Sequence, residues 1–526
     1  MAAVTAALFS NAQQVKLSWS SESKNFVVFG AFALGVDNQL IKLCFQPDFG
    51  SAFSSDGKTN PIITSYNDNL VEANSQSIYS SQNKVKFSSL LSIKKNLYFF
   101  TNLYDSKSKS TTFYCQPLDI KNFKAKGENM DLGTLSALKK SEQSTVEYLI
   151  SDDSTKVLMM GVAPSSKSEV EKYYMGVYDY QMKKLWEKTI ELPFKSKDVE
   201  ILNSLVTNDG RVAVLIKHFD SGTDKEQVRK DGKKVPSYST KLLLYNKENA
   251  TPEEFIINIG DKFAHSLAIA KEKDNELILF GLYKQKSDGN VNGYFLTQIN
   301  LDTKKSSSTN INSFPENLLK LIEKDDQGSD SNRDGGIASA FKFMKMETRA
   351  NGDRDFIIEY CKKAWISGGS SFNQNYASQN YILYHHGDIL DINIKANGTN
   401  VITRIPKLQI STESANAASF KSMVYKDKLL VFYNDDEDNL EQDLSKKPKE
   451  TKMGVGGRKL LGGTADALLT MATIDANGNL TRTVLMDKKQ SKFITAVNVS
   501  LVLENQKLAL YAIKGTKDMV GLLEIK

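Results

Sequence analysis

A hairpin pattern that recurs along almost the whole chain constrains the fold more than any other feature of this sequence. Each copy is an apolar strand, a short polar turn with Asp, Asn or Gly, and a second strand that begins with Leu, Val or Phe. Two such runs joined by a short polar turn are typical of a β-hairpin. The eight copies span residues 28–45, 85–100, 145–161, 199–217, 263–281, 341–360, 420–433 and 497–512.

The spacing of the hairpins predicts the repeating unit. Their second strands begin at successive intervals of 57, 60, 55, 65, 79, 73 and 79 residues. Each hairpin is followed by a third strand, as in residues 174–185, and usually by a fourth, as in residues 185–192. Four antiparallel strands repeated at such intervals are typical of a β-propeller. The sequence therefore predicts an all-β fold, a single β-propeller of eight four-stranded blades. Seven blades is the alternative count, because two of the units are long.

The two ends of the chain predict how the ring closes. The last unit ends with its third strand at residues 519–526, and residues 14–20 precede the first hairpin without a unit of their own. Pairing these two segments would complete the eighth blade and remove open sheet edges. We therefore expect one propeller domain over residues 13–526, closed by an N-terminal strand that joins the C-terminal blade.

Three long insertions are expected on this scaffold, at residues 325–336, 367–379 and 435–463, all polar or rich in glycine. Flexible loops on a rigid scaffold are more often recognition surfaces than core supports. Between residues 446 and 459, six basic residues are accompanied by Glu450 alone. We therefore expect this loop to contact an acidic partner, such as anionic lipid headgroups or an acidic protein face. The candidate binding residues are Lys446, Lys447, Lys449, Lys452, Arg458 and Lys459.

The first twelve residues determine the expected compartment. Residues 2–9 are apolar, and Ser10, Asn11 and Ala12 then give the small-x-small pattern that signal peptidase recognises. No Lys or Arg precedes the apolar run, so the positive n-region is missing. We interpret residues 1–12 as a truncated signal peptide and expect an exported protein, periplasmic or associated with the outer membrane. The alternative is an unprocessed N-terminus and a cytosolic interaction propeller.

The sequence lacks the motifs of common catalytic sites. It has no G-x-S-x-G, no H-E-x-x-H and no phosphate-binding G-x-x-x-x-G-K-[ST]. His385 and His386 are adjacent on a predicted strand, so they point to opposite faces and cannot share one ion. We therefore predict no catalytic, cofactor-binding or metal-ligating residue, and no cofactor. Three widely spaced cysteines lie in apolar strands and are interpreted as core residues: Cys44, Cys115 and Cys361.

Charge and hydropathy argue against nucleic-acid binding and against a membrane-spanning helix. Lys and Arg number 68 and Asp and Glu number 62, a net charge of +6, and the two signs are interspersed without the basic stripe of a nucleic-acid-binding protein. The longest apolar stretch is far shorter than the ~20 residues of a transmembrane helix. We expect no nucleic acid and no transmembrane segment. The expected partner is another envelope protein or a glycan, bound by a monomer or by a component of a hetero-complex.

Several strand-and-turn motifs suggest a family. They are YNDNLVEA at residues 66–73, YILYHHGDILDINIKANG at 381–398, RIPKLQIS at 404–411, LLVFYND at 429–435 and TIDANGNL at 473–480. Over most of residues 13–526 the chain resembles uncharacterised exported β-propeller proteins (WD40/YWTD-like) of Bacteroidota. The resemblance implies a periplasmic or outer-membrane-associated location. It offers no activity and no catalytic residue to carry over.

These features predict a non-catalytic binding or scaffold module of the bacterial cell envelope. The alternative is a glycan- or glycoconjugate-active enzyme with paired carboxylates in the mouth of the propeller channel, where residues from different blades meet. The two functions predict different channels. Two or more desolvated carboxylates beside an aromatic wall would favour the enzyme, and a shallow mouth of mixed polarity would favour binding.

Overall fold

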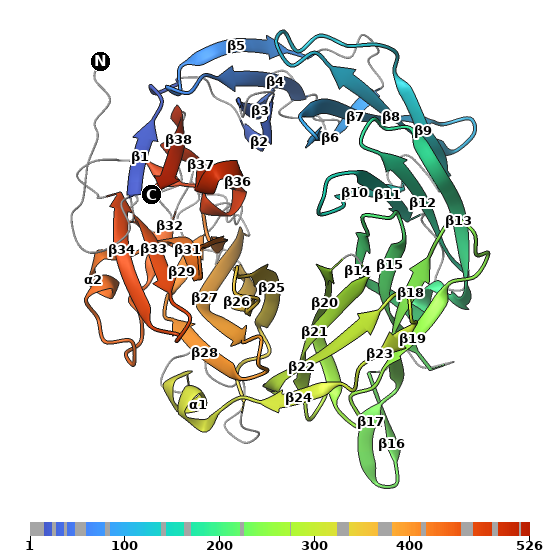
Figure 1. The fold of residues 1–526 in the computed structure, drawn as a ribbon, viewed down its shortest axis with the longest axis vertical. Coiled ribbons are helices and arrows are strands. Elements are labelled where there is room, and N and C mark those ends of the chain that lie inside the picture. Colours follow the sequence, from blue (N-terminus) through green and yellow to red (C-terminus); the bar gives the residue numbers. More distant parts are fainter. Residues whose placement is uncertain are drawn as a thin grey trace, which may run out of the picture.

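The computed structural model places eight sheets in chain order around a central channel (Figure 1), as the hairpin repeat predicts. Each sheet is one antiparallel blade, and the first strand of a blade lies nearest the channel. The residues that the structure describes are 15–23, 28–35, 39–47, 59–78, 85–137, 144–162, 170–220, 226–273, 275–322, 336–366, 381–411, 417–453, 467–486, 493–514 and 517–526.

The first four blades each have four strands. Blade 1 contains β2 (Val28–Leu34), β3 (Leu40–Pro47), β4 (Thr59–Tyr66) and β5 (Glu72–Ser77). Blade 2 contains β6 (Val85–Ile93), β7 (Asn96–Asp105), β8 (Ser110–Leu118) and β9 (Met130–Ser136). Blade 3 contains β10 (Thr145–Ile150), β11 (Lys156–Val162), β12 (Val170–Asp179) and β13 (Lys184–Lys195). Blade 4 contains β14 (Val199–Val206), β15 (Val212–Phe219), β18 (Tyr238–Tyr245) and β19 (Glu253–Ile257).

The outer strand is divided in blades 5 and 6. Blade 5 contains β20 (Phe263–Lys273), β21 (Glu276–Lys284), β22 (Val291–Asn300), β23 (Lys305–Ser306) and β24 (Asn310–Ser313), followed by helix α1 (Glu316–Ile322). Blade 6 contains β25 (Phe341–Thr348), β26 (Arg354–Ile366), β27 (Tyr381–Ile394), β28 (Asn400–Ile405) and β29 (Gln409–Ser411).

Blade 7 contains β30 (Phe420–Tyr425), β31 (Lys428–Asp435), β33 (Leu468–Ile474) and β34 (Leu480–Met486). Blade 8 contains β35 (Ile494–Thr495), β36 (Leu501–Leu503), β37 (Lys507–Lys514), β38 (Lys517–Ile525) and β1 (Val15–Trp19).

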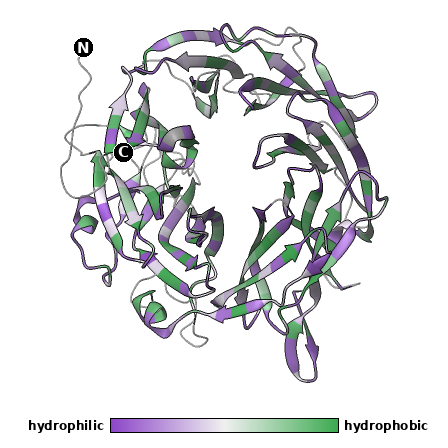
Figure 2. Cartoon of the chain, viewed as in Figure 1, coloured by the Kyte–Doolittle hydropathy of each residue, from purple (hydrophilic) through white to green (hydrophobic). Residues whose placement is uncertain are grey.

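The core consists of the contacts between neighbouring blades. The second strands β11, β15, β21, β31 and β37 are buried along most of their length, because each is covered on both faces by adjacent blades. Such strands read as continuous apolar runs, and Figure 2 shows hydrophobic residues along the strands of every blade. Eight buried apolar clusters each join one pair of adjacent blades, including blades 8 and 1. The ring therefore has eight blades, and the alternative of seven was wrong.

The expected closure is confirmed. Strand β1 pairs antiparallel with β38, from Val15 opposite Ile525 to Trp19 opposite Gly521. The ring of Trp19 packs over Gly521, where an added Cβ would lie only 2.6 Å from it. Next to this strand, Lys42 of blade 1 and Asp518 of blade 8 form a buried ion pair of 2.8 Å. Main-chain pairing and one buried charge pair thus join the first and last blades.

The third insertion differs from the expected loop where the structure describes it, up to Met453. It forms the short helix α2 (Glu437–Leu440) and then strand β32 (Thr451–Met453), which pairs in parallel with β29 of blade 6. Residues 436–453, here named the strap, therefore connect blade 7 to the neighbouring blade. Asn439 holds the strap because its side chain exchanges two hydrogen bonds with the backbone of Lys449, at 2.6 and 2.9 Å.

Other connections bear on the surface of the ring. Strands β16 (Gln227–Lys230) and β17 (Lys233–Pro236) form a hairpin that projects from blade 4 (Figure 1). The hairpin turns at Asp231 and Gly232, both with positive φ, as a tight two-residue turn requires. The insertions at 325–336 and 367–379 lie outside the described residues except for Gly336, and so do residues 1–12. Neither α1 nor α2 is long and apolar enough to cross a bilayer, and they are the α-helices of the described chain.

Candidate functional site

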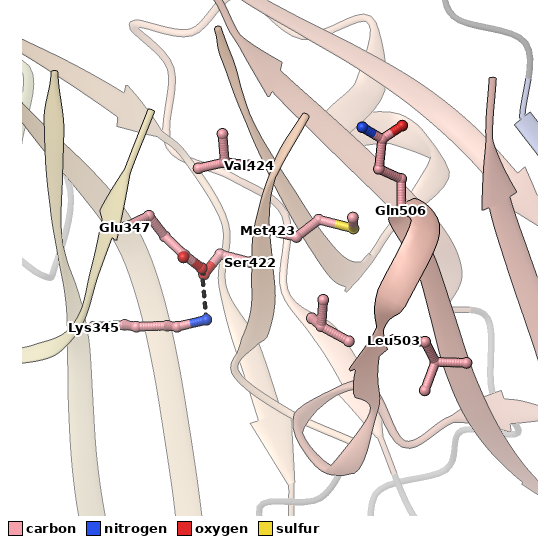
Figure 3. Close-up of a pocket in the computed structure, with 8 residues that line it drawn as sticks. Lys345, Glu347, Ser422, Met423, Val424, Leu503 and Gln506 are labelled. Atoms are coloured by element: carbon pink, nitrogen blue, oxygen red, sulfur yellow. Dashed lines mark hydrogen bonds and ion pairs between the residues drawn. The ribbon is translucent and has the colours of Figure 1, made fainter. Parts of the chain in front are cut away.

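The first strands of blades 6, 7 and 8 enclose a pocket on the channel side of the ring, here named the channel pocket (Figure 3). Its volume is about 190 Å³, and its residues come from β25, from β30, from β36 and from the turn that follows β36. Lys345, Glu347 and Ser422 form a polar wall. Val424 lies on the same side as Ser422, and the opposite side holds Met423, Val502 and Leu503 with the polar Gln506.

The local structure of β25 explains the polar wall. A register shift between Phe343 and Lys345 interrupts the pairing of β25 with β26. The first strands of blades 1, 2, 4 and 5 have a shift at the same place in their pairing. A β-bulge changes the direction of the side chains that follow it. Lys345 and Glu347 then lie two residues apart on one face of the strand.

A compact charge arrangement occupies the polar wall. The Lys345 ammonium lies 2.6 Å from Glu347 Oε1, and Ser422 donates to the same oxygen at 2.8 Å. The side chain of Lys345 is 44% exposed, whereas that of Glu347 is 16% exposed. On β30, burial and the charge of Lys345 lower the pKa of Lys421. Two lysines therefore accompany one carboxylate, and an acidic group of a ligand would be attracted here.

The lining of the channel pocket differs from that of a glycosidase site. Its single carboxylate is already ion-paired, and none of the described residues that line it is aromatic. Hydrolysis of a glycosidic bond requires two carboxyl groups on opposite sides of the bond. The volume is also below the ~300–1,000 Å³ typical of small-molecule sites. A single side chain or chain terminus of a partner would fit it.

A second pocket lies where the ring closes. Its volume is about 140 Å³, and it lies between Ser20, Lys42, Tyr66 and Asp518. The Lys42–Asp518 ion pair forms part of its wall. Because these residues join blade 1 to blade 8, we assign this pocket to the closure of the ring.

The predicted partner-binding lysines are found in the strap. Lys446 and Lys447 are exposed, and Lys449 lies 3.1 Å from Asp436 and 2.6 Å from Asp438. Lys449 is thus paired with acidic residues at the start of α2, outside the segment of residues 446–459. Contact with an acidic partner through this loop stays a prediction. Lys452 lies 3.6 Å from Glu450, and Arg458 and Lys459 lie outside the described residues.

The cysteines and histidines differ in their environments. Cys44 and Cys115 are buried, as predicted, but Cys361 is only half-buried and contacts Glu359 and His386, so its interpretation as a core residue was wrong. His265 Nε2 donates a 3.1 Å hydrogen bond to the carbonyl oxygen of Phe341. Burial and the nearby Lys284 lower the pKa of His265 to about 4.

Sequence reasoning missed the channel pocket. Lys345 and Ser422 are 77 positions apart and belong to different blades, so no local motif joins them. One signal was available, since residues 341–348 read FKFMKMET and place three charged residues in a first strand. Their convergence with β30 and β36 depends on the curvature of the ring.

No family model matches the chain, and no curated protein is similar to it at a significant level. Solved β-propeller structures are similar in fold. The WD40 domain of SCAP from fission yeast is 8% identical over 97% of this chain and 94% of its own, with a TM-score of 0.39. The propeller domain of the trilobed protease from Pyrococcus furiosus is 8% identical over 72% and 93%, with a TM-score of 0.34.

A peptidase with a propeller is also similar. The acylaminoacyl peptidase of Pyrococcus horikoshii is 12% identical over 93% of this chain, with a TM-score of 0.37. This chain spans 58% of the length of that enzyme. Identities and TM-scores this low support no inference about what the chain binds or catalyses. The class defined by the ring itself is the β-propeller.

Proposed function

We propose that this β-propeller is a non-catalytic binding module that holds a protein or glycan partner at its channel pocket. The observation that carries the proposal is the composition of this pocket, one ion-paired carboxylate, two lysines nearby and an aliphatic wall without aromatic lining among the described residues. This is the mixed-polarity site expected of a binding module. The paired, desolvated carboxylates expected of a glycan-active enzyme are not the chemistry of this pocket.

The geometry also favours a macromolecular partner. A pocket of about 190 Å³ accommodates one large side chain and little more. Protein interfaces concentrate their binding energy in a few anchors that fill such pockets, while the surrounding contacts exclude water. An acidic or amphipathic anchor would meet Lys345 on one side and Leu503 on the other. We propose the cell envelope as the place of binding, on the signal-peptide pattern of residues 1–12.

Quantitative affinity capture tests the proposal. Wild type, Lys345→Glu and the control Lys305→Glu, which reverses an exposed charge on the outer strand β23, are used to capture proteins and glycans from envelope fractions. We expect a partner that wild type and Lys305→Glu retain and that Lys345→Glu loses. Equal capture by all three proteins would refute binding at this pocket. N-terminal sequencing of the native protein tests export, which predicts a first residue of Gln13.

A further inference from the structure

Three different metal-ligating side chains meet at the contact between blades 6 and 7. Glu359 and Cys361 lie two residues apart on β26, and His386 lies opposite Cys361 on β27. A register shift between Glu359 and Cys361 brings the three side chains together. Glu359 is fully buried, His386 is nearly so, and Cys361 is half-buried. None of the three residues lines the channel pocket.

The separations of the three ligand atoms agree with a tetrahedral metal centre. Cys361 Sγ lies 3.3 Å from Glu359 Oε2 and 3.6 Å from His386 Nδ1, and Nδ1 lies 3.2 Å from Oε2. Zinc binds sulfur at ~2.3 Å and nitrogen or oxygen at ~2.0–2.1 Å. Tetrahedral angles then require S···N and S···O separations of about 3.5 Å and an N···O separation of about 3.3 Å. The observed atoms lie close to these positions.

We propose that Glu359, Cys361 and His386 bind a divalent transition-metal ion of the zinc type. One thiolate, one imidazole and one carboxylate form a mixed S, N, O donor set, which suits Zn²⁺ and its analogue Co²⁺ better than Mg²⁺ or Ca²⁺. Three protein ligands leave a fourth position for water or a ligand. Cys361 is the most exposed of the three, so access to the metal is expected on its side.

Neighbouring side chains orient the Glu359 carboxylate and keep it ionised. Lys407 donates to Glu359 Oε1 at 2.7 Å, which leaves Oε2 directed at the thiol and the imidazole. Ser419 of blade 7 also donates to Oε2, at 2.6 Å. Burial opposes ionisation of Glu359, but Lys407 and His386 outweigh it and lower its pKa to about 2. Hydrogen bonds to the outer atoms of a ligand are the usual support of a metal site.

Protons balance on binding. In the metal-free protein, burial and the charge of Glu359 raise the pKa of the Cys361 thiol, so the thiol is protonated at neutral pH. Binding replaces this proton by the metal–sulfur bond and releases the thiol proton as H⁺. The ammonium of Lys407 repels the ion, so we expect weaker binding than in closed structural zinc sites. For the same reason, Lys407→Met should bind the metal more tightly.

The sequence prediction of no metal-ligating residue depended on the adjacent pair His385 and His386. The argument that His385 and His386 face opposite sides of a strand holds, since His386 pairs opposite Cys361 and His385 opposite Lys362. That argument excludes a site with both histidines and leaves open a site that uses one of them. The pair also supplies a matched control, because His385 has the same chemistry on the other face.

The test is a titration of chelator-treated protein with Co²⁺ and then Zn²⁺. We expect one Co²⁺ per chain, with a thiolate-to-cobalt charge-transfer band and the visible bands of a four-coordinate ion. Loading with Co²⁺ should release the thiol proton. Zn²⁺ should then displace the Co²⁺, and both sets of bands should disappear. Cys361→Ser should lose the charge-transfer band, and it and His386→Gln should weaken zinc binding at least about tenfold. His385→Gln should behave as wild type.

Two results would overturn the site. One is wild-type protein that takes up Co²⁺ without a thiolate band, or takes up none. The other is equal zinc affinity of wild type, Cys361→Ser and His386→Gln. Circular dichroism and urea unfolding without metal show whether each variant folds. If Cys361→Ser does not fold, His386→Gln and the wild-type band decide the question, and tighter zinc binding by Lys407→Met is a further, independent result in favour.

Discussion

Replacing Asp518 by Ala should weaken the closure of the ring more than any exposed charge substitution. Asp518 lies 2.8 Å from Lys42, and the two side chains are only 3% and 7% exposed. Burial acts to lower the pKa of Lys42, but Cys44, Tyr66 and Asp518 outweigh burial and raise it. Lys42 therefore stays charged, and without Asp518 its ammonium would be left between blades 8 and 1 without a counter-charge.

The size of the effect follows from this burial. Removing one partner of a buried ion pair costs about 3–5 kcal/mol, because the other charge stays desolvated. The pocket of about 140 Å³ beside the pair can admit water to Lys42 in the variant. We therefore expect Asp518→Ala to lower the free energy of unfolding by about 3 kcal/mol, the low end of that range. Lys42→Met with Asp518→Ala removes both charges and should recover about half of the loss or more.

Urea unfolding of wild type, both single variants and the double variant gives the interaction energy directly. The control is Glu191→Ala, which breaks the pair of Lys172 and Glu191; this pair is shorter, at 2.6 Å, but its side chains are 49% and 59% exposed. Exposed pairs contribute about 0.2–1 kcal/mol. If Asp518→Ala cost no more than Glu191→Ala, or if the two single effects added, burial would not be what makes the Lys42–Asp518 pair important.

Three further changes test the closure and the strap. Burial raises the pKa of Asp435 to about 6, above its unfolded value of ~3.9, so the folded state binds the extra proton and wild-type stability should fall as pH rises from about 4 to 6. Asp435→Asn should flatten this dependence and stabilise the protein at pH 8, by about 2–3 kcal/mol in urea unfolding, and an unchanged slope would contradict it. Asn439→Ala should speed amide hydrogen exchange in β32, because it removes both hydrogen bonds to the backbone of Lys449. Gln442→Ala, which removes one exposed hydrogen bond to the Lys447 carbonyl, should not. Equal exchange rates in the two variants would show that Asn439 does not hold the strap. Gly521→Val should destabilise the ring by about 1–3 kcal/mol through its clash with Trp19, and should cost less in a Trp19→Ala background; equal costs would exclude that contact.

The architecture could be predicted because its signals are local. A hairpin such as β10–β11 is encoded by adjacent runs of the sequence, and its repetition sets the number of blades. Closure could also be predicted, since Gln14 to Ser20 had no other partner and the last unit lacked a fourth strand. The divided outer strands of blades 5 and 6 left no such signal. In blade 5, β22 pairs with β23 at one end and with β24 further along. In blade 6, the long strand β27 pairs with β28 at one end and with β29 at the other.

The sites could not be predicted, because their residues meet through the ring. Lys345 reaches Glu347 within one strand, but Ser422 and Leu503 come from two other blades. The strap shows the same limit. Its lysines were assessed against the nearest acidic residue in sequence, whereas Lys449 pairs with Asp436, 13 positions earlier, because α2 reverses the chain. Charge balance in a loop depends on its fold, and composition alone does not give it.

Blade 6 contains buried charged residues that hydrophobic packing would not require. Fully or almost fully buried ionisable side chains gather in this blade: Arg349, Asp355, Glu359, Asp388, Asp391, Arg404 and Lys407. Some form ion pairs, as in the 2.6 Å contact of Arg404 with Asp388. Replacing a buried ion pair by apolar residues of similar volume is often neutral or stabilising, so stability by itself gives little reason for these charges.

Other contacts between blades consist of apolar side chains. Between blades 3 and 4 the buried cluster is made of side chains such as Leu158, Val177 and Ile216. At the contact between blades 6 and 7, Glu359 instead collects donors from both blades, with Lys407 on one side and Ser419 on the other. A carboxylate held ionised in the core, beside a thiol and an imidazole, has a use in binding a cation that an apolar cluster could not have. This is the physical reason why the metal site is expected in blade 6, where buried ionisable side chains gather.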